Sequence, residues 1–324
     1  MEPRRKSKRR RAAGSGFRPL VSVVTATYNR SQVLRLAIAS LLRSTFKDWE
    51  LIVVGDACTD DTAEVVASFD DARVRFVNLP ENCGDQSGPN NEGCRLAAGK
   101  YIAFLNHDDL WLPDHLETLL AVIEREKAEL AFARGISVMP DGSTLILGAA
   151  PRGRYEPVAD VHASLWLFRR EMLAEVGPWR LSRSSRTPPS QDWLIRAWRL
   201  KKKMVPSDRF TVIAVQALYY PDCYKRRRSE VHDQLSASME SEPAFRERLL
   251  TRAVLDASAR LKSIHVGRQA AALVRALVYG ILLAARIPPV RVKYILKSLR
   301  RGDYQRKMQR KRGSPVHGPR KHGE

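Results

Sequence analysis

The chain has 324 residues, 44% of them hydrophobic, so it is long enough to bury a large core in one or two domains. Its formal net charge of +21 is concentrated at the two ends: residues 1–18 carry +7 and residues 236–324 carry +14. Residues 19–235 contain 28 bases and 28 acids and are neutral. This balance argues against a domain built around a groove for a polyanion, and it favours a catalytic or binding domain with basic extensions.

The cysteines and the apolar segments bear on the compartment. Cys58, Cys83, Cys94 and Cys223 show no CxxC spacing, so we expect reduced thiols in a cytoplasmic protein. The basic start has no apolar run behind it, so no secretory signal is expected. The longest charge-free stretch of the apolar C-terminal segment, residues 276–285, has ten residues, well below the roughly 20 that span a bilayer.

Residues 20–130 alternate between buried strands and amphipathic helices. Apolar, β-branched runs predict strands covered on both faces, and apolar residues at helical spacing predict the helices between them. The predicted strands are residues 20–28, 49–56, 74–80 and 100–109, and the predicted helices are residues 31–44, 60–69, 88–99 and 113–130. This alternation predicts a doubly wound α/β sheet, in which ligands bind beyond the carboxyl ends of the strands.

The following region is less regular. It predicts two strands around a turn, then a strand with a helix, and then another helix, after which the chain is mainly helical up to a polar tail. The predicted strands are residues 129–139 and 143–148, the strand–helix pair is residues 164–177, and the further helix is residues 190–203.

Polar clusters follow three of the first four strands, at 25–29, 55–61 and 106–109. Because the carboxyl ends of parallel strands meet at one edge of the sheet, these clusters should line one crevice. The first strand is followed by neither GxxxxGK[ST] nor GxGxxG, and the chain has no GxSxG, which removes support for P-loop, dinucleotide and α/β-hydrolase readings. Acids at strand ends favour a divalent cation bound through oxygen and shared with phosphates.

Four segments resemble family 2 glycosyltransferases, the GT-A-fold enzymes that use nucleotide sugars. In order they are "VSVVTATYNR", "LIVVGDACTDDT", "GKYIAFLNHDDLWLPDHL" and "FRREMLAEVGPWR…SQDWLIRAWR". The resemblance covers about residues 19–235 and implies a GT-A fold, a Rossmann-like, mostly parallel sheet flanked by helices. We therefore expect a disordered basic arm (1–18), a catalytic domain (19–235, with a nucleotide-sugar half to 129 and an acceptor half from 130), a helical extension (236–300) and a disordered basic tail (301–324).

The resemblance also implies which residues bind the donor. Thr27, Tyr28 and Asn29 would line the nucleotide, and Asp56 resembles the acid that pairs with N3–H of the base, a group that uracil and thymine possess. The alternative is that Asp56 only caps the next turn. The family often has a second acid beside it, and here that position is Gly55.

The family's DxD-type signature falls on Asn106, His107 and Asp108. The resemblance implies that Asp108 holds Mn²⁺ or Mg²⁺ and that Asn106 stands where an acid usually contacts the ribose or a metal-bound water, which predicts weakened metal affinity. Asp108 could otherwise be a solvated loop acid. Asp109 is expected to start the following helix, although a role in the site stays open. His107 is expected to point away from Asp108.

Asp192 resembles the acid that serves as general base in the inverting members, where a carboxylate deprotonates the acceptor hydroxyl. It could also be the N-cap of a helix that starts at Trp193, and the two roles are compatible. Gln191 replaces a further acid common in the family. Trp179 and Trp193 could stack on sugar rings or belong to the core.

The basic extensions suggest further partners. Arg268, Arg275 and Arg286 would share one face of an unbroken helix, with apolar residues on much of the remainder. Such a helix suits either an anionic membrane surface or packing on the catalytic domain.

The leading hypothesis is a metal-assisted glycosyltransferase, cytoplasmic and peripheral on the inner face of the plasma membrane. It would move a sugar from a UDP- or dTDP-type donor to a glycan or lipid-linked acceptor of the cell envelope, with inversion and Asp192 as base. One alternative is a degenerate member that binds nucleotide sugar or glycan without catalysis, motivated by Gly55, Asn106 and Gln191. Another is a nucleic-acid-binding protein that acts through its basic tails.

Overall fold

The computed structural model describes residues 18–158, 161–182, 187–215, 229–262 and 266–292. The predicted arm, except for Arg18, lies outside the described residues, as do Cys223 and the predicted tail.

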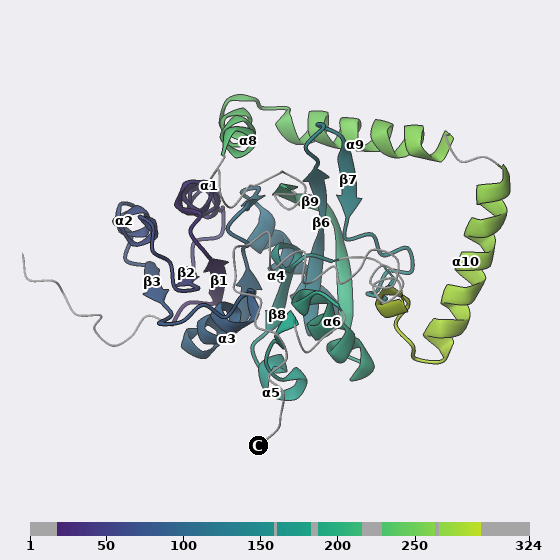
Figure 1. Cartoon of the computed structure of the whole chain (residues 1–324), viewed down its shortest axis with the longest axis horizontal. Coiled ribbons are helices and arrows are strands. Elements are labelled where there is room, and N and C mark those ends of the chain that lie inside the picture. Colours follow the sequence, from purple (N-terminus) through teal and green to yellow (C-terminus); the bar gives the residue numbers. More distant parts are fainter. Residues whose placement is uncertain (1–17, 159–160, 183–186, 216–228, 263–265, 293–324) are drawn as a thin grey trace, which may run out of the picture.

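One sheet runs through the described part of the chain, with strand order β3-β2-β1-β4-β8-β6-β9-β5 and β7 beside β6 (Figure 1). The strands are β1 Val21–Thr27, β2 Trp49–Gly55, β3 Val74–Asn78, β4 Tyr101–Phe104, β5 Asp109–Trp111, β6 Leu130–Val138, β7 Thr144–Leu147, β8 Trp166–Arg169 and β9 Met204–Val215. The helices of the domain are α1 Ser31–Leu42, α2 Thr62–Ala67, α3 Ser87–Leu96, α4 His115–Glu126, the 3₁₀ turn η1 Ala163–Leu165, α5 Met172–Val176 and α6 Pro189–Arg199.

The first half of the sheet is parallel. β1 pairs with β2 on one side and β4 on the other, and β2 pairs with β3. The apolar side chains of β1, β2 and β4 are buried on both faces, which explains why these strands read as almost continuous apolar runs. The prediction of a doubly wound sheet is confirmed, and the carboxyl ends of β1, β2 and β4 lie at one edge.

The second half mixes directions. β8 is antiparallel to β4 and β6, whereas β9 is parallel to β6 and antiparallel to β5. The sequence predicted β6, β7 and β8 but not β5 or β9. β5 has only three residues, and β9 contains Pro206, which lacks an N–H, and an irregular register opposite Phe132 to Gly135, so neither shows a regular strand pattern.

Two helices after the domain pack on it. α8 (Glu230–Ser241) crosses residue 235, where we expected the catalytic domain to end, and α9 (Phe245–Lys262) follows it. Phe245 is buried in a second apolar cluster with Leu36 of α1, Leu110 of β5 and Ile213 of β9. Each fully buried apolar side chain of this size contributes roughly 1.5–3 kcal/mol to folding. The cluster therefore fastens α8 and α9 to the domain.

A third helix, α10 (Val266–Ala284), lies at the edge of the molecule (Figure 1). Its residues Val274, Leu277 and Ile281 are 61%, 67% and 60% exposed, so this part of the helix does not pack on the domain by its apolar face. The side chain of Arg268 lies outside what the structure describes. Among the described residues, no helix is long and apolar enough to cross a membrane.

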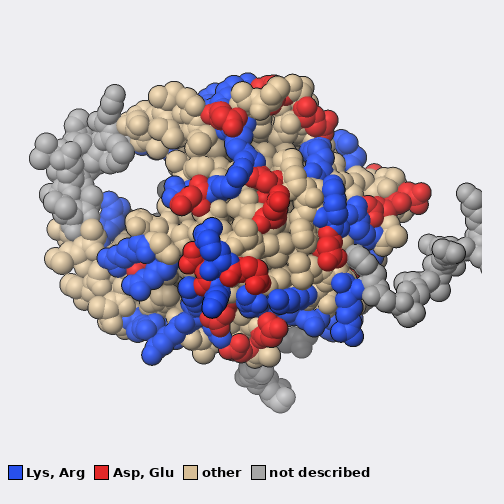
Figure 2. Space-filling view, turned by 180° about the vertical axis from the view of Figure 1, so that it is seen from behind, with Lys and Arg blue, Asp and Glu red and all other residues tan. Residues whose placement is uncertain are grey.

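The charged side chains of the domain are interleaved. Figure 2 shows Lys and Arg side chains mixed with Asp and Glu over the face opposite to that of Figure 1, in place of one continuous basic patch. This distribution agrees with the neutral balance of residues 19–235.

Candidate functional site

The loops after β1 and β2 are tied to each other at the edge where ligands bind in such sheets. Asn29 adopts a left-handed backbone with φ 48°, which Asn tolerates better than most residues. Its Oδ1 accepts the N–H of Thr59 at 2.8 Å, and its Nδ2 donates to Thr59 Oγ1 at 3.3 Å. Thr27 is buried and Tyr28 is half-buried beside it. The structure therefore brings these three predicted nucleotide-binding residues to one place, next to the β2 loop.

Asp56, directly after β2, is 5% exposed. Its carboxylate accepts the N–H of Cys83 at 2.7 Å and the N–H of Gly84 at 3.3 Å. Burial raises the pKa of Asp56, and these two backbone donors partly offset the rise. The side chain therefore fixes the loop at residues 83 and 84 against the end of β2, whatever else it binds.

Gly55 sits where the family often has an acid. A Cβ on this residue would lie 2.4 Å from Asn78 Oδ1, 3.0 Å from the Phe76 ring and 3.1 Å from Cys58 Sγ. Asn78 uses its side chain to accept the N–H of Cys58 at 2.8 Å and to donate to the Cys58 carbonyl at 2.9 Å. The space of the missing side chain is thus filled by an amide that holds the turn after β2.

The turn after β4 is organised around Asp109, which is buried. Asn106 Nδ2 and Ser164 Oγ donate to Asp109 Oδ2 at 2.8 and 2.5 Å. Burial is the main cause that raises the pKa of Asp109 well above its usual range, and the charge of the neighbouring Asp108 is the second cause. The prediction that Asp109 starts the following helix is wrong, because Asp109 begins β5 and α4 begins only at His115, after Asp114.

Asp108 lies in the same turn and has a side chain that is 20% exposed. His107, which we expected to point away from it, has Nε2 4.0 Å from Asp108 Oδ2. The ring of His232 on α8 lies with Nε2 3.1 Å from the Asp108 carbonyl oxygen, and burial lowers the pKa of His232. Helix α8 therefore contacts the Asp108 turn directly.

The donor set of this turn fits a hard divalent cation. The described residues contain no group of three or more His, Cys, Asp or Glu side chains that could hold a metal ion. Since Asp109 is buried, Asp108 is the acid of this turn that reaches solvent. Mg²⁺ and Mn²⁺ are often held by one or two carboxylates, with phosphate oxygens and waters as the other ligands. One accessible acid therefore suffices when the phosphates of a bound nucleotide sugar supply further ligands.

Asp192 lies in the first turn of α6, which begins at Pro189, so the expectation that it caps a helix starting at Trp193 is wrong. It is buried, and its Oδ2 accepts a hydrogen bond from Arg196 Nε at 3.0 Å. The Nε2 of Gln191 donates to the Val161 carbonyl at 2.8 Å. Val161 stands three residues before Ser164, the residue that binds Asp109. One short segment therefore connects the helix of Asp192 to the turn of Asp108.

Trp179 and Trp193 are core residues. Both are buried, and both pack against Trp166 with ring centroids 5.8 and 5.1 Å away. Trp193 Nε1 also donates to the Gly177 carbonyl at 3.0 Å. This stack leaves neither indole available to a sugar ring, and it explains why α6 is held firmly against β8.

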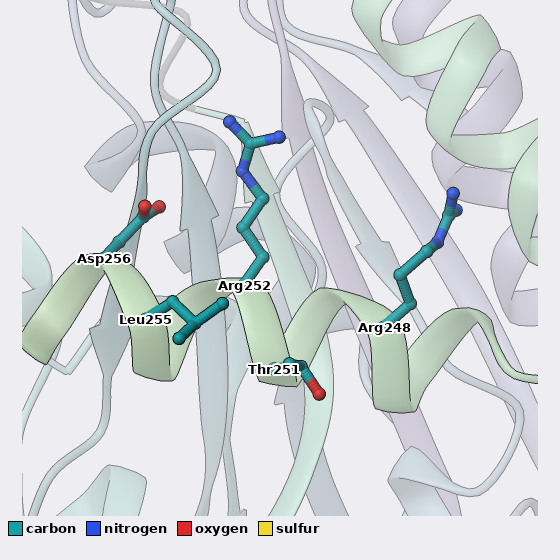
Figure 3. A pocket seen from close by; sticks show the side chains of 5 residues that line it. All are labelled: Arg248, Thr251, Arg252, Leu255 and Asp256. Carbon is teal, nitrogen blue, oxygen red and sulfur yellow. The ribbon is translucent and has the colours of Figure 1, made fainter.

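A hollow lies on α9, lined by Arg248, Thr251, Arg252, Leu255 and Asp256 (Figure 3). Asp256 accepts the N–H and the hydroxyl of Thr144 at 2.8 and 2.7 Å, which holds α9 on β7. None of the predicted site residues lines this hollow.

Sequence reasoning missed Ser164, Asn78 and Arg196. Ser164 and Asn78 are single polar residues whose partners are distant in sequence, and nothing in the local sequence marks them. Only Arg196 left a signal, its spacing of four residues from Asp192, which is a common spacing for ion pairs on a helix.

The doubly wound half, the mixed half and the polar loops after β1, β2 and β4 together form a GT-A fold. The structure of S. aureus TarS 1-349 in complex with UDP-GlcNAc is similar to it, with a TM-score of 0.52 and 17% identity, over 88% of this chain and 92% of that one. This likeness shows the fold. Residues 22–177, just under half of the chain, match the model of Glycosyl transferase family 2.

Curated relatives are similar to parts of this chain as well. The UDP-Glc:alpha-D-GlcNAc-diphosphoundecaprenol beta-1,3-glucosyltransferase WfgD of Escherichia coli is 33% identical over 104 residues, 32% of this chain and 41% of the relative. The amylovoran biosynthesis glycosyltransferase AmsB of Erwinia amylovora is 30% identical over 172 residues, 48% of this chain and 57% of the relative. The chain thus spans about half the length of these relatives.

Proposed function

We propose that the protein transfers a sugar from a UDP- or dTDP-type donor to a glycan or lipid-linked acceptor hydroxyl. The observation that carries the proposal is the connection described above. Residues 161–164 bond both to the helix of the candidate base, Asp192, and to the turn of the candidate metal ligand, Asp108. The match to the model of Glycosyl transferase family 2, and a relative named for a UDP-glucose donor and a diphosphoundecaprenol-linked acceptor, support this substrate class.

The residues of the chain divide the reaction between the two halves. Thr27, Tyr28, Asn29 and Asp56 would line the nucleotide at the edge of the parallel half. Asp108 would hold Mn²⁺ or Mg²⁺, which supplies positive charge that stabilises the leaving diphosphate. Asp192 would accept the proton of the acceptor hydroxyl as that oxygen attacks the anomeric carbon, with inversion.

A donor panel tests the proposal. Purified protein would be incubated with UDP- and dTDP-sugars, with a short glycan or an undecaprenyl-diphosphate sugar as acceptor, and with Mn²⁺, Mg²⁺ or EDTA. We expect nucleotide release that requires the acceptor and is lost in EDTA. No release with any donor would overturn the transferase proposal.

The same panel decides between this function and its two alternatives. A degenerate member would bind UDP in calorimetry yet release no nucleotide. A nucleic-acid-binding protein would bind duplex DNA in a strongly salt-dependent manner and bind no nucleotide in the presence of metal. The neutral domain, with interleaved charges on the face shown in Figure 2, gives the last alternative no support, so it would rest on the basic tails alone.

We also propose that α10 brings the protein to an anionic membrane. Residues 257–302 contain ten Lys or Arg and no Asp or Glu, and α10 exposes Val274, Leu277, Val278 and Ile281. An apolar helix face accompanied only by positive charge fits an anionic lipid surface better than a second copy of this chain, because the second copy would carry the same positive charge.

Vesicle sedimentation tests this membrane contact. The protein should sediment with vesicles containing phosphatidylglycerol but not with vesicles of phosphatidylcholine alone, and Leu277→Glu with Ile281→Glu should reduce the bound fraction at least fivefold. Leu200→Glu, another exposed apolar position, is the matched control and should bind like the parent. Equal binding of the double variant and the parent would contradict the role of α10.

A further inference from the structure

Asn106, Asp109 and Ser164 form a closed ring of hydrogen bonds. Asn106 Nδ2 donates to Asp109 Oδ2 at 2.8 Å, and Ser164 Oγ donates to the same oxygen at 2.5 Å. The backbone N–H of Asn106 in turn donates to Ser164 Oγ at 2.9 Å. The ring is closed because the serine hydroxyl both donates and accepts, as a hydroxyl can.

The ring holds both ends of the Asp108 turn. Asn106 and Asp109 flank the turn, and the N–H of Asp109 also donates to the Asn106 carbonyl at 3.1 Å. Ser164 is fully buried, and its own carbonyl accepts Nε1 of Trp111 at 2.9 Å. The turn is thereby attached to a rigid part of the core rather than left as a surface loop.

An amide at position 106 is what this ring requires. The amide nitrogen is a donor, and its partner is a buried carboxyl oxygen. An aspartate at 106 would present an acceptor oxygen to Asp109 Oδ2 in place of the donor N–H, so this hydrogen bond would be lost. The acid common in the family therefore could not donate the hydrogen bond that Asn106 makes in this chain.

We propose that Asn106 and Ser164 are positioning residues, which act through Asp109 to present Asp108 to the metal–diphosphate. The proposal rests on the role given to Asp108 above. In this proposal Asn106 supports the turn and is not a weakened ligand, because its side-chain nitrogen already donates to Asp109. Groups behind a metal ligand commonly change metal affinity by about ten- to a hundredfold when they are lost.

A charge swap tests the proposal. The variants are Asn106→Asp, Ser164→Ala, and the double variant Asn106→Asp with Asp109→Asn, which returns one amide and one carboxyl group to the pair. Each is measured by calorimetry for UDP binding with and without Mn²⁺, and by thermal unfolding without nucleotide. Ser137→Ala is the matched control, since Ser137 is a fully buried serine whose hydroxyl has no hydrogen-bond partner among the described residues.

We expect Asn106→Asp to lower the melting temperature and to weaken Mn²⁺-dependent UDP binding about tenfold or more. Ser164→Ala should act in the same direction. The double variant should recover most of both losses, and Ser137→Ala should show neither. Metal-independent UDP binding should change less than metal-dependent binding, a split that a general loss of folding would not produce.

The opposite results would overturn the proposal. If Asn106→Asp strengthened Mn²⁺-dependent binding at an unchanged melting temperature, position 106 would be a direct ligand position. If the swap recovered nothing, the two residues would not act as a pair. Should the parent protein bind no UDP, the proposed function fails, but the melting temperatures of the single and double variants still decide whether the ring is a unit.

Discussion

Asp192 and Arg196 form a buried ion pair one helical turn apart on α6, with Nε 3.0 Å from Oδ2. Their side chains are 4% and 13% exposed. The same guanidinium also donates to the carbonyls of Val176 and Pro178, at the end of α5. The candidate base is therefore held by a side chain that also joins α6 to α5.

Replacing the candidate base should separate chemistry from binding. Asp192→Asn keeps the shape and an oxygen for Arg196 but cannot take up a proton. We expect the transfer rate to fall by about 10²- to 10⁴-fold, the usual contribution of a general base, with UDP binding unchanged. Rates from nucleotide release and affinities from calorimetry give the two numbers. Full activity in this variant would remove Asp192 from the mechanism.

Removing the partner of the base should cost stability. Arg196→Met removes the Arg196 cation from a buried carboxylate, and breaking such a pair typically costs about 3–5 kcal/mol. Urea unfolding measures the loss, and adding Asp192→Asn should return part of it. Arg95→Met is the control, because Arg95 makes an exposed pair with Glu92, whose loss should cost much less stability. Equal losses at both arginines would contradict the importance of burial here.

Restoring the acid at position 55 should harm the fold. Gly55→Asp places its Cβ 2.4 Å from Asn78 Oδ1, so Asn78 must move and release Cys58. We expect a loss of about 1–3 kcal/mol from overpacking, measured by thermal unfolding. Combining it with Asn78→Gly should reduce the clash. Gly280→Ala, where no atom lies within 4 Å of the added Cβ, should be neutral or slightly stabilising.

His115 should make the protein less stable in acid. It is buried, its Nδ1 lies 2.7 Å from Thr211 Oγ1, and burial lowers its pKa to about 3. The unfolded chain, with a His pKa near 6.5, binds one more proton between these values. The free energy of unfolding should therefore fall as the pH drops below about 6.5, by up to about 1.4 kcal/mol per pH unit from this group.

Urea unfolding between pH 4 and pH 8 measures this dependence. His115→Asn, whose amide can replace Nδ1 toward Thr211, should give a shallower slope below pH 6.5. A slope that matched that of the parent would show that His115 is not the group responsible.

The parallel half of the sheet could be predicted because β1, β2 and β4 are buried on both faces and each carries its own apolar signal. For the same reason the sequence predicted that Asn29, Asp56 and Asp108 lie at one edge of the sheet. β9 was missed because it contains a proline and pairs with β6 in an irregular register, so its own sequence does not show a strand pattern. It is a strand because it pairs with β6 and β5. Asp109 was misjudged for a similar reason: Ser164, which binds it, lies 55 residues further along the chain.

The three positions without the family's acids also look different in three dimensions. Asn78 fills the space beside Gly55, Asn106 binds Asp109, and Gln191 binds the Val161 carbonyl. Each position has a structural partner in this chain. The sequence shows only that the three carboxylates are missing, because the structural partners of these positions lie between 3 and 30 residues away along the chain.

The pairing of β5 with β9 dictates an order of events during synthesis. β5, which begins with Asp109, finds its neighbour only when residues 212–214 of β9 have been made, about a hundred residues later. Ser164, the other support of the Asp108 turn, also comes later than the turn itself. A ribosome-bound chain that ends before Ser164 would possess every strand of the parallel half and still lack both supports of the Asp108 turn. Nascent chains of this protein should therefore stay unable to engage a metal–nucleotide until the acceptor half has emerged and folded.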